Sequence, residues 1–194
     1  MPPVEAGPLE PRVLLTEEEI ESTVARLAAG MSARYHDGVV LIGVLRGSVP
    51  FLADLVRGMT VPVSVDFMAI TPYTPGSGRV RLLKDLDLDI AGRDAVIVED
   101  IVDTGLSTAF LRTELERRNP RSVAVCTLLD RRIRRVVPVE IAFAGTEVAD
   151  AFVVGYGLDH EGRYRNLRLI AAADVELLAG DPDVYVPVFY GSES

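Results

Sequence analysis

The sequence predicts a single α/β domain: a central, mostly parallel sheet flanked by helices. The chain has 194 residues, of which 48% are hydrophobic, so it can bury the core of one domain. Short β-branched runs, of which GVVLIGVL (38–45) is the clearest, are typical of strands buried on both faces. These runs alternate with segments of helical periodicity, and that alternation favours a parallel sheet with helices on both faces.

The elements follow from local patterns. Thr16-Glu17-Glu18-Glu19 has the form of a capping box, and apolar residues at helical spacing extend this first helix to about Tyr35. Four prolines within residues 1–12 indicate a flexible N-terminal arm. We expect one domain over 13–194. Further helices are expected at about 50–57, 107–118 and 174–179, and strands at 38–45, 63–70, 80–84, 95–98, 122–129, 140–144 and 152–154.

Composition excludes several function classes. The formal net charge of −9 argues against nucleic acid or an anionic membrane as a partner. No apolar run is long enough to cross a bilayer, and the first residues lack the pattern of a secretion signal. The single cysteine, Cys126, excludes an intramolecular disulfide framework and fits a reducing compartment, where we expect it to be buried packing. We therefore expect a cytoplasmic protein.

One segment carries the chemistry. Glu99 and Asp100 stand at the carboxyl end of an apolar strand, where ligands bind in open α/β sheets. The turn that follows, from Asp103 to Ser107, opens a helix and offers backbone N–H groups and hydroxyls to a phosphate. The two carboxylates would repel a phosphate but suit hydroxyls or a metal ion. A ligand with a sugar diol beside a phosphate would satisfy all these groups.

The stretch Glu99–Gly105, EDIVDTG, closely resembles the phosphoribosyl-diphosphate (PRPP) signature of type I phosphoribosyltransferases, in the form found in the hypoxanthine-guanine branch. Further resemblances lie in the family's order over roughly residues 38–170. They are Leu45-Arg46-Gly47 for the diphosphate-binding loop, 65–68 and 83–86 for the strands on either side of a mobile lid, 151–159 for the purine-stacking and metal-binding segment, and Arg165 for the arginine after it.

The resemblance implies the type I phosphoribosyltransferase fold, in which N-terminal and C-terminal segments build a small hood. It implies roles in the PRPP half of the site as well. Glu99 and Asp100 would contact the ribose hydroxyls and the shell of a Mg²⁺ cofactor. Asp103 would be the catalytic general base facing the purine N7. The 5′-phosphate would lie in the turn formed by Thr104, Gly105, Leu106, Ser107 and Thr108, and the diphosphate would be bound by Leu45, Arg46, Gly47 and Arg165.

It also implies roles in the base half. Phe152 would stack on the purine, the main chain of Val153 would read its exocyclic edge, and Asp159 would lie beside the base and hold a second Mg²⁺. Taken alone, Phe152 would be ordinary core and Arg165 a solvated arginine. Arg131 stands where the family usually has a lysine for the purine O6. The whole basic run 131–135 suits a solvated loop, and His160 receives no role.

The implied function is Mg²⁺-dependent transfer of phosphoribose from PRPP to hypoxanthine or guanine, with PRPP and a free purine base as partners and a homodimer or homotetramer as the assembly. Two departures, Arg131 and a short lid with Pro72-Tyr73 where Ser-Tyr is usual, motivate an alternative acceptor: a modified purine or deazapurine in nucleoside natural-product biosynthesis. A non-catalytic, PRPP-responsive regulator that binds nucleic acid, and a plain nucleotide-binding module, are the other hypotheses. The net charge and the presence of Asp103 and Arg165 argue against the regulator.

Overall fold

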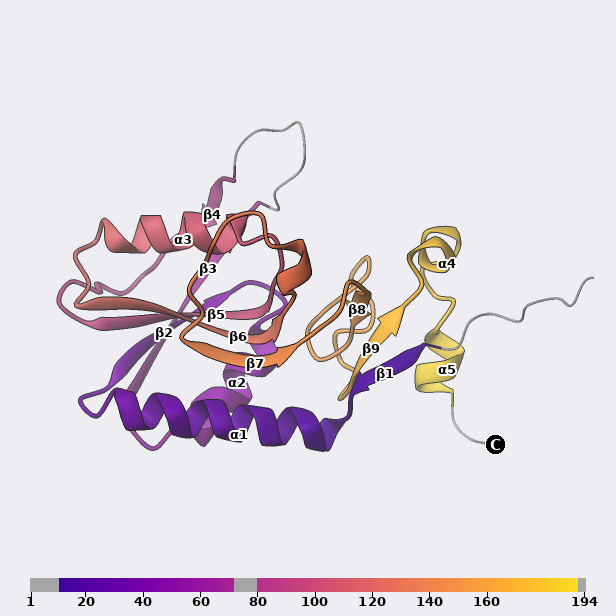
Figure 1. Cartoon of the computed structure of the whole chain (residues 1–194), viewed down its shortest axis with the longest axis horizontal. Helices are drawn as coiled ribbons and strands as arrows, with labels where there is room; N and C mark the ends of the chain where they lie inside the picture. The colour runs from indigo at the N-terminus through magenta and orange to yellow at the C-terminus, as the bar shows by residue number, and fades with distance from the viewer. Residues whose placement is uncertain (1–10, 72–79, 192–194) are drawn as a thin grey trace, which may run out of the picture.

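The computed structural model describes residues 11–71 and 80–191, which form a six-stranded sheet and a separate three-stranded sheet (Figure 1). The larger sheet has the order β4-β3-β2-β5-β6-β7, and all its pairs are parallel except that of β3 with β4. Its strands are β2 (Val39–Val44), β3 (Val63–Ile70), β4 (Leu82–Lys84), β5 (Asp94–Val102), β6 (Ser122–Asp130) and β7 (Phe143–Glu147). The predicted α/β class and mostly parallel sheet are confirmed.

Helices cover both faces of this sheet. Helices α1 (Glu17–Arg34) and α2 (Val49–Gly58) lie on one face, and α3 (Leu106–Glu116) lies on the other (Figure 1). Because successive strand residues point to opposite faces, Leu41 and Val96 pack in the core beneath α1 and α2, while Val40 and Ile97 pack beneath α3. All four side chains are fully buried, as the β-branched runs predict.

The start of α1 follows the predicted capping box. The Thr16 hydroxyl accepts from the Glu19 N–H at 3.3 Å, and the Glu19 carboxylate accepts from the Thr16 N–H at 2.9 Å. These two bonds satisfy donors that the first helical turn leaves without partners. A short 3₁₀ helix, η1 (Arg132–Arg134), follows β6.

The second sheet forms the hood, in the antiparallel order β1-β9-β8. Its strands are β1 (Arg12–Leu15), β8 (Phe152–Val154) and β9 (Ile170–Ala173), and the helices α4 (Val175–Gly180) and α5 (Val186–Tyr190) follow β9. The hood therefore combines N-terminal and C-terminal segments. Its C-terminal part has its own cluster of buried residues, Val154, Tyr164, Leu167, Leu178 and Tyr185. Arg12 already lies in β1, inside the arm expected over 1–12, whereas residues 1–10 of that arm lie outside the described residues.

Three expectations about strands are wrong in their bounds or their number. Strand β5 continues past Val98 to Val102, because Glu99 still pairs with Thr127 of β6 although the apolar pattern has ended. Strand β7 lies three residues later than the expected 140–144 and runs through Gly145. A Cβ at Gly145 would come 2.1 Å from the Leu128 carbonyl oxygen, so the glycine permits close backbone contact with β6. Strands β1 and β9 were not predicted.

Two other expectations are addressed by the described part of the chain. Cys126 is fully buried in β6, as predicted, and burial raises the pKa of its thiol well above the ordinary value. Among the described residues, the helices are too short or too polar to span a membrane.

Candidate active site

Most of the residues predicted to bind ligand meet around one cavity of about 330 Å³ at the carboxyl ends of the parallel strands. It lies between the loop after β2, the end of β5 and the start of the hood. Nine predicted residues line it: Leu45, Arg46, Gly47, Asp100, Arg131, Phe152, Val153, Asp159 and Arg165. Glu99 and the 103–108 turn do not line this cavity, and Pro72 and Tyr73 of the expected lid lie outside the described residues.

Glu99 is buried beneath the site. Its side chain is 6% exposed, and its Oε1 accepts a hydrogen bond from the Thr108 hydroxyl at 2.6 Å. Burial raises its pKa to about 7, the nearby charge of Asp100 adds to the rise, and the Thr108 hydrogen bond opposes it. In this arrangement Glu99 ties the end of β5 to the first turn of α3.

Asp100 lies at the cavity wall in a crowded position. Its Oδ1 accepts from the Ile101 N–H at 3.0 Å, and burial raises its pKa to about 6. Within this site the charge of Arg165 lowers that pKa and the charge of Asp159 raises it. A Cβ at Gly47 would come 1.7 Å from Asp100 Oδ2, so a larger residue there would have to displace this carboxylate or the loop after β2.

The turn at 103–105 is fixed by the segment that follows β6. The Thr104 carbonyl accepts from the N–H groups of Val136 and Val137 at 2.9 and 3.0 Å, and Arg135 Nε donates to the Asp103 carbonyl at 2.9 Å. Gly105 caps α3 with a φ of +82°, a conformation that favours glycine. The turn leads directly into the N-terminus of this 11-residue helix, the position that the sequence assigns to the 5′-phosphate.

Arg131 connects the two sheets. Its side chain is 7% exposed, and its guanidinium pairs with Asp103 Oδ2 at 3.3 Å and donates to the Ala151 carbonyl at the start of the hood. Among the described residues, Asp103 Oδ1 and Arg131 Nε are buried with no hydrogen-bond partner. The unpaired acceptor and the unpaired donor belong to the two side chains that the sequence assigns to the purine.

The basic run 131–135 is only partly a solvated loop. Arg132 and Arg134 are exposed, whereas Arg131 and Arg135 are not. Arg135 pairs with the buried carboxylate of Asp130. It also donates to the carbonyls of Val102 and Asp103, and so holds the 103–105 turn in place. Sequence reasoning missed this supporting role. A basic run directly after an acidic strand end was the available signal.

Asp159 and Arg165 form the hood side of the cavity. Arg165 pairs with Asp159 Oδ1 at 2.7 Å and donates to the Gly157 carbonyl at 2.6 Å. Asp159 Oδ2 also accepts from the Gly162 N–H at 2.7 Å. The two side chains are about one-third exposed, so the site carries both an anion-binding and a cation-binding group at its rim.

Phe152 is half-buried and meets His160 edge to face, with ring centroids 5.7 Å apart. Val153 is buried within the hood sheet, where it pairs with Ala172. The predicted base-contacting pair therefore lies on β8, with one aromatic face bordered by His160.

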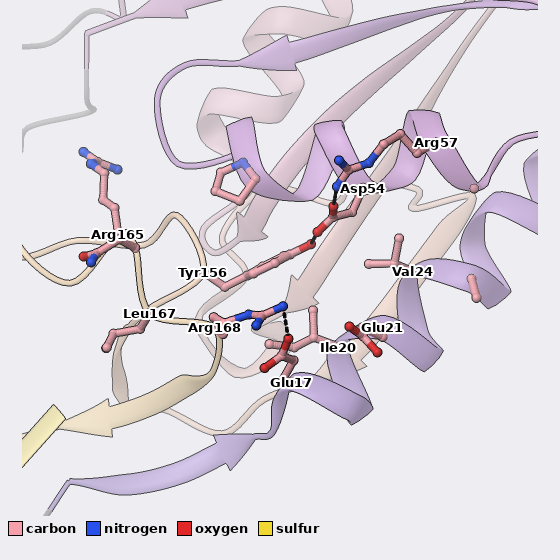
Figure 2. Close-up of a pocket in the computed structure, with 14 residues that line it drawn as sticks. Glu17, Ile20, Glu21, Val24, Asp54, Arg57, Tyr156, Arg165, Leu167 and Arg168 are labelled. Atoms are coloured by element: carbon pink, nitrogen blue, oxygen red, sulfur yellow. Dashed lines mark hydrogen bonds and ion pairs between the residues drawn. The ribbon is translucent and has the colours of Figure 1, made fainter. Parts of the chain in front are cut away.

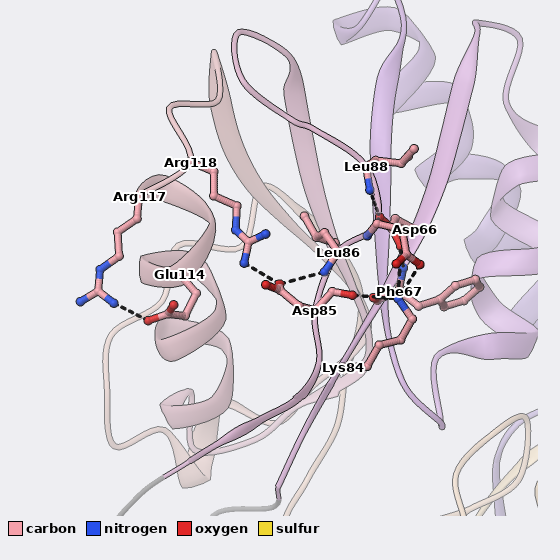
Figure 3. A network of polar contacts seen from close by, with 10 residues as sticks. Asp66, Phe67, Lys84, Asp85, Leu86, Leu88, Glu114, Arg117 and Arg118 are labelled. Carbon is pink, nitrogen blue, oxygen red and sulfur yellow. Dashed lines mark hydrogen bonds and ion pairs between the residues drawn. The ribbon is translucent and has the colours of Figure 1, made fainter.

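The segments on either side of the expected lid form a polar network (Figure 3). Asp66 of β3 is 5% exposed, and its carboxylate accepts from the N–H groups of Phe67, Asp87 and Leu88. Lys84 of β4 donates to the Phe67 carbonyl and lies 3.6 Å from Asp66. These contacts join β3 to Lys84 of β4 and to the residues that follow β4.

Comparison with known proteins decides the family. A family model described as a phosphoribosyl transferase domain matches residues 14–161. The chain is 45% identical to the hypoxanthine-guanine phosphoribosyltransferase of Mycobacterium avium, over 84% of this chain and 85% of that protein. It is 47% identical to the hypoxanthine phosphoribosyltransferase of Salmonella typhimurium, over 80% of this chain and 90% of that protein. The chain belongs to the hypoxanthine-guanine phosphoribosyltransferase family.

Solved structures of this family share the fold. A hypoxanthine-guanine phosphoribosyltransferase from Bacillus anthracis superposes with a TM-score of 0.81 at 37% identity, covering 84% of this chain and 98% of that one. A hypoxanthine phosphoribosyltransferase from Staphylococcus aureus gives 0.82 at 37% identity, covering 86% and 92%. The chain is thus an enzyme of the phosphoribosyltransferase class. This family membership favours catalysis over the regulator and the plain nucleotide-binding module.

Proposed function

We propose that this enzyme transfers phosphoribose from PRPP to hypoxanthine or guanine in a Mg²⁺-dependent reaction, releasing diphosphate and the nucleoside 5′-monophosphate. The observation that carries the proposal is the meeting of Asp100, Asp159, Arg165 and the 45–47 loop at one cavity at the strand ends. That set supplies groups for a diphosphate and a divalent cation together. The names of the similar enzymes, which specify hypoxanthine or guanine, support the acceptor.

In the PRPP half, the backbone of the 45–47 loop and the Arg165 guanidinium would bind the diphosphate. The 5′-phosphate would lie at the N-terminus of α3, among Thr104, Gly105, Leu106, Ser107 and Thr108. The bond from the ribose C1 to diphosphate breaks as the purine nitrogen bonds to C1. Positive charge that develops on the ribose would be stabilised by the carboxylate of Asp100, which lines the cavity, while Glu99, buried beneath the site, would hold the start of α3 through Thr108.

The donor set fits Mg²⁺ only together with substrate. Within the described residues there is no cluster of three or more carboxylate, His or Cys groups that could hold a metal alone. Asp100 and Asp159 nevertheless border the same cavity, and the charge of Asp159 raises the pKa of Asp100, a repulsion that a cation would relieve. Mg²⁺ is commonly held by one or two carboxylates with substrate phosphates and water. When bound, it would neutralise charge on the departing diphosphate.

In the base half, Asp103 would accept the proton that the purine loses as its other ring nitrogen bonds to the ribose. Its buried Oδ1 has no hydrogen-bond partner among the described residues, so this atom can accept from a purine N–H. Arg131 is held beside it and would face the purine O6, while Phe152 and Val153 would contact the ring.

A modified purine or deazapurine is the second candidate acceptor. Arg131 favours it, because its guanidinium is committed to Asp103 and Ala151 and differs in size and donor geometry from a lysine ammonium. We further propose that the enzyme acts as a homodimer or homotetramer.

The test is release of diphosphate from PRPP and Mg²⁺ across a panel of hypoxanthine, guanine, xanthine, adenine and several deazapurines. Asp103→Asn keeps the shape of the side chain and removes the base, so it should lower kcat by about 10²- to 10⁴-fold. Turnover of hypoxanthine or guanine supports the first acceptor, and turnover of a deazapurine alone supports the second. PRPP binding without turnover of any base would contradict the proposal.

A further inference from the structure

A second cavity, of about 500 Å³, lies between α1, α2 and the 156–168 segment and is not explained by the proposed reaction (Figure 2). Arg165 lines both this cavity and the candidate active site. Four charged side chains on its walls form two ion pairs, Arg57 with Asp54 and Arg168 with Glu17. The wall that separates it from the active site is the segment that carries Tyr156 and Arg165.

Tyr156 joins this wall to helix α2. Its side chain is 9% exposed and belongs to the core cluster beneath α1 and α2, and its hydroxyl donates to Asp54 Oδ2 at 2.5 Å (Figure 2). Asp54 is 38% exposed and pairs with Arg57 through its other oxygen. Helix α2 begins directly after the 45–47 loop, so this hydrogen bond links the hood segment to the element that supports the proposed diphosphate loop.

The backbone around Tyr156 is tightly constrained. Gly155, Tyr156 and Gly157 all have positive φ angles, of 104°, 47° and 99°. The Tyr156 N–H donates to the Leu167 carbonyl, and the Gly157 N–H donates to the Arg165 carbonyl. A tyrosine held at positive φ requires stabilising contacts, and here the buried ring and the bond to Asp54 provide them.

The 155–157 segment packs directly against the 45–47 loop, which is the proposed diphosphate loop. A Cβ at Gly157 would come 1.9 Å from the Gly47 carbonyl oxygen, and a Cβ at Gly47 would come 1.7 Å from Asp100 Oδ2. Asp100, Gly47 and Gly157 are therefore stacked with no room for a side chain between them. Arg165 is attached to the same stack through the Gly157 carbonyl.

We infer that Tyr156 and Asp54 are positioning residues: their hydrogen bond sets how the 155–165 segment lies against the 45–47 loop, and thereby sets the diphosphate-binding geometry. The inference rests on the proposed function, since it assigns the stacked loops to the diphosphate of PRPP. Neither residue touches the reacting atoms. Their effect should fall on PRPP binding rather than on the purine.

The kinetic test compares Tyr156→Phe with Tyr185→Phe. Tyr185 is a matched control, because it is 2% exposed and its hydroxyl makes one hydrogen bond, from the Asp174 N–H, within the hood. We expect Tyr156→Phe to raise the KM for PRPP about tenfold, the effect of losing a hydrogen bond to a charged group, while the KM for hypoxanthine changes less than about twofold. Tyr185→Phe should lower the Tm without raising the KM for PRPP relative to the KM for hypoxanthine.

Variants of Asp54 separate a positioning role from general destabilisation. Asp54→Asn keeps an acceptor for the tyrosine hydroxyl and should retain a low KM for PRPP. Asp54→Ala should resemble Tyr156→Phe, and combining the two should cost no more than either alone. Equal changes in both KM values, or additive effects in the double variant, would overturn the inference.

A readout on the unliganded protein distinguishes failure of this inference from failure of the proposed function. Hydrogen exchange of the peptide spanning 155–167 should be faster in Tyr156→Phe than in the wild type and in Tyr185→Phe. Unchanged exchange would refute the positioning role whatever the enzyme's substrate. Faster exchange, with no turnover by the wild type, would refute only the proposed function.

Discussion

The ionisation of Glu99 should lower the free energy of unfolding as pH rises, and Glu99→Gln should remove this contribution to the pH dependence. The folded-state pKa of about 7 lies above the ordinary 4.5, so between these values the folded chain holds a proton that the unfolded chain has lost. Stability from this group is therefore fully present below about pH 4.5 and is lost as pH rises through about 7. Between pH 5 and pH 8 the loss amounts to about 2 to 3 kcal/mol, since each pKa unit is worth about 1.4 kcal/mol.

The assay is urea unfolding of the unliganded protein at pH 5 and pH 8. Glutamine still offers a carbonyl to the Thr108 hydroxyl, so the fold should be kept while the ionisation is removed. The wild type should lose about 2 to 3 kcal/mol more than Glu99→Gln between the two pH values. Glu116→Gln, which removes an exposed partner of Arg112, should behave like the wild type. Parallel pH dependence in the wild type and Glu99→Gln would refute the reasoning.

Three further perturbations follow from packing. Gly47→Ala would place a methyl group against Asp100, so the KM for PRPP should rise at least about tenfold; an unchanged KM would contradict the crowding. Arg135→Ala would leave the buried Asp130 with only an exposed partner and should lower the free energy of unfolding by about 2 kcal/mol in urea titrations, whereas a change below about 0.5 kcal/mol would contradict this role. The Cys126 thiol, buried and with a raised pKa, should react with an aromatic disulfide reagent only on unfolding; rapid reaction of the native enzyme would contradict its burial.

The elements that local chemistry specifies were predictable from the sequence. The capping box at Thr16 and the apolar run at 39–44 are local patterns, and the helix start and the buried strand that they predict are both confirmed. The hood strands β1 and β9 were not predictable in this way. Each of these strands has four residues, too few to show a periodic pattern. They form because β1 pairs with β9, which places Arg12 opposite Ala172 from the far end of the chain.

The candidate site shows the same division. The motifs identify the residues that gather at the cavity, because a motif's spacing reflects a local turn or strand end. The support around them is long-range: Arg135 holds the 103–105 turn from 30 or more positions away, and Tyr156 reaches Asp54 across 102 positions. Such contacts depend on how the elements pack. The basic run after β6 was a signal for Arg135, but no local pattern indicates its partners or that of Tyr156.

The most direct test of the central claim is calorimetric titration of PRPP into the enzyme with Mg²⁺, using the wild type and Arg165→Gln. The claim is that the cavity formed by the 45–47 loop, Asp100, Asp159 and Arg165 binds the diphosphate of PRPP. We predict binding to the wild type that weakens about tenfold or more without Arg165, because a charge-assisted hydrogen bond to phosphate is lost. No binding to the wild type, or equal binding by the two proteins, would contradict it.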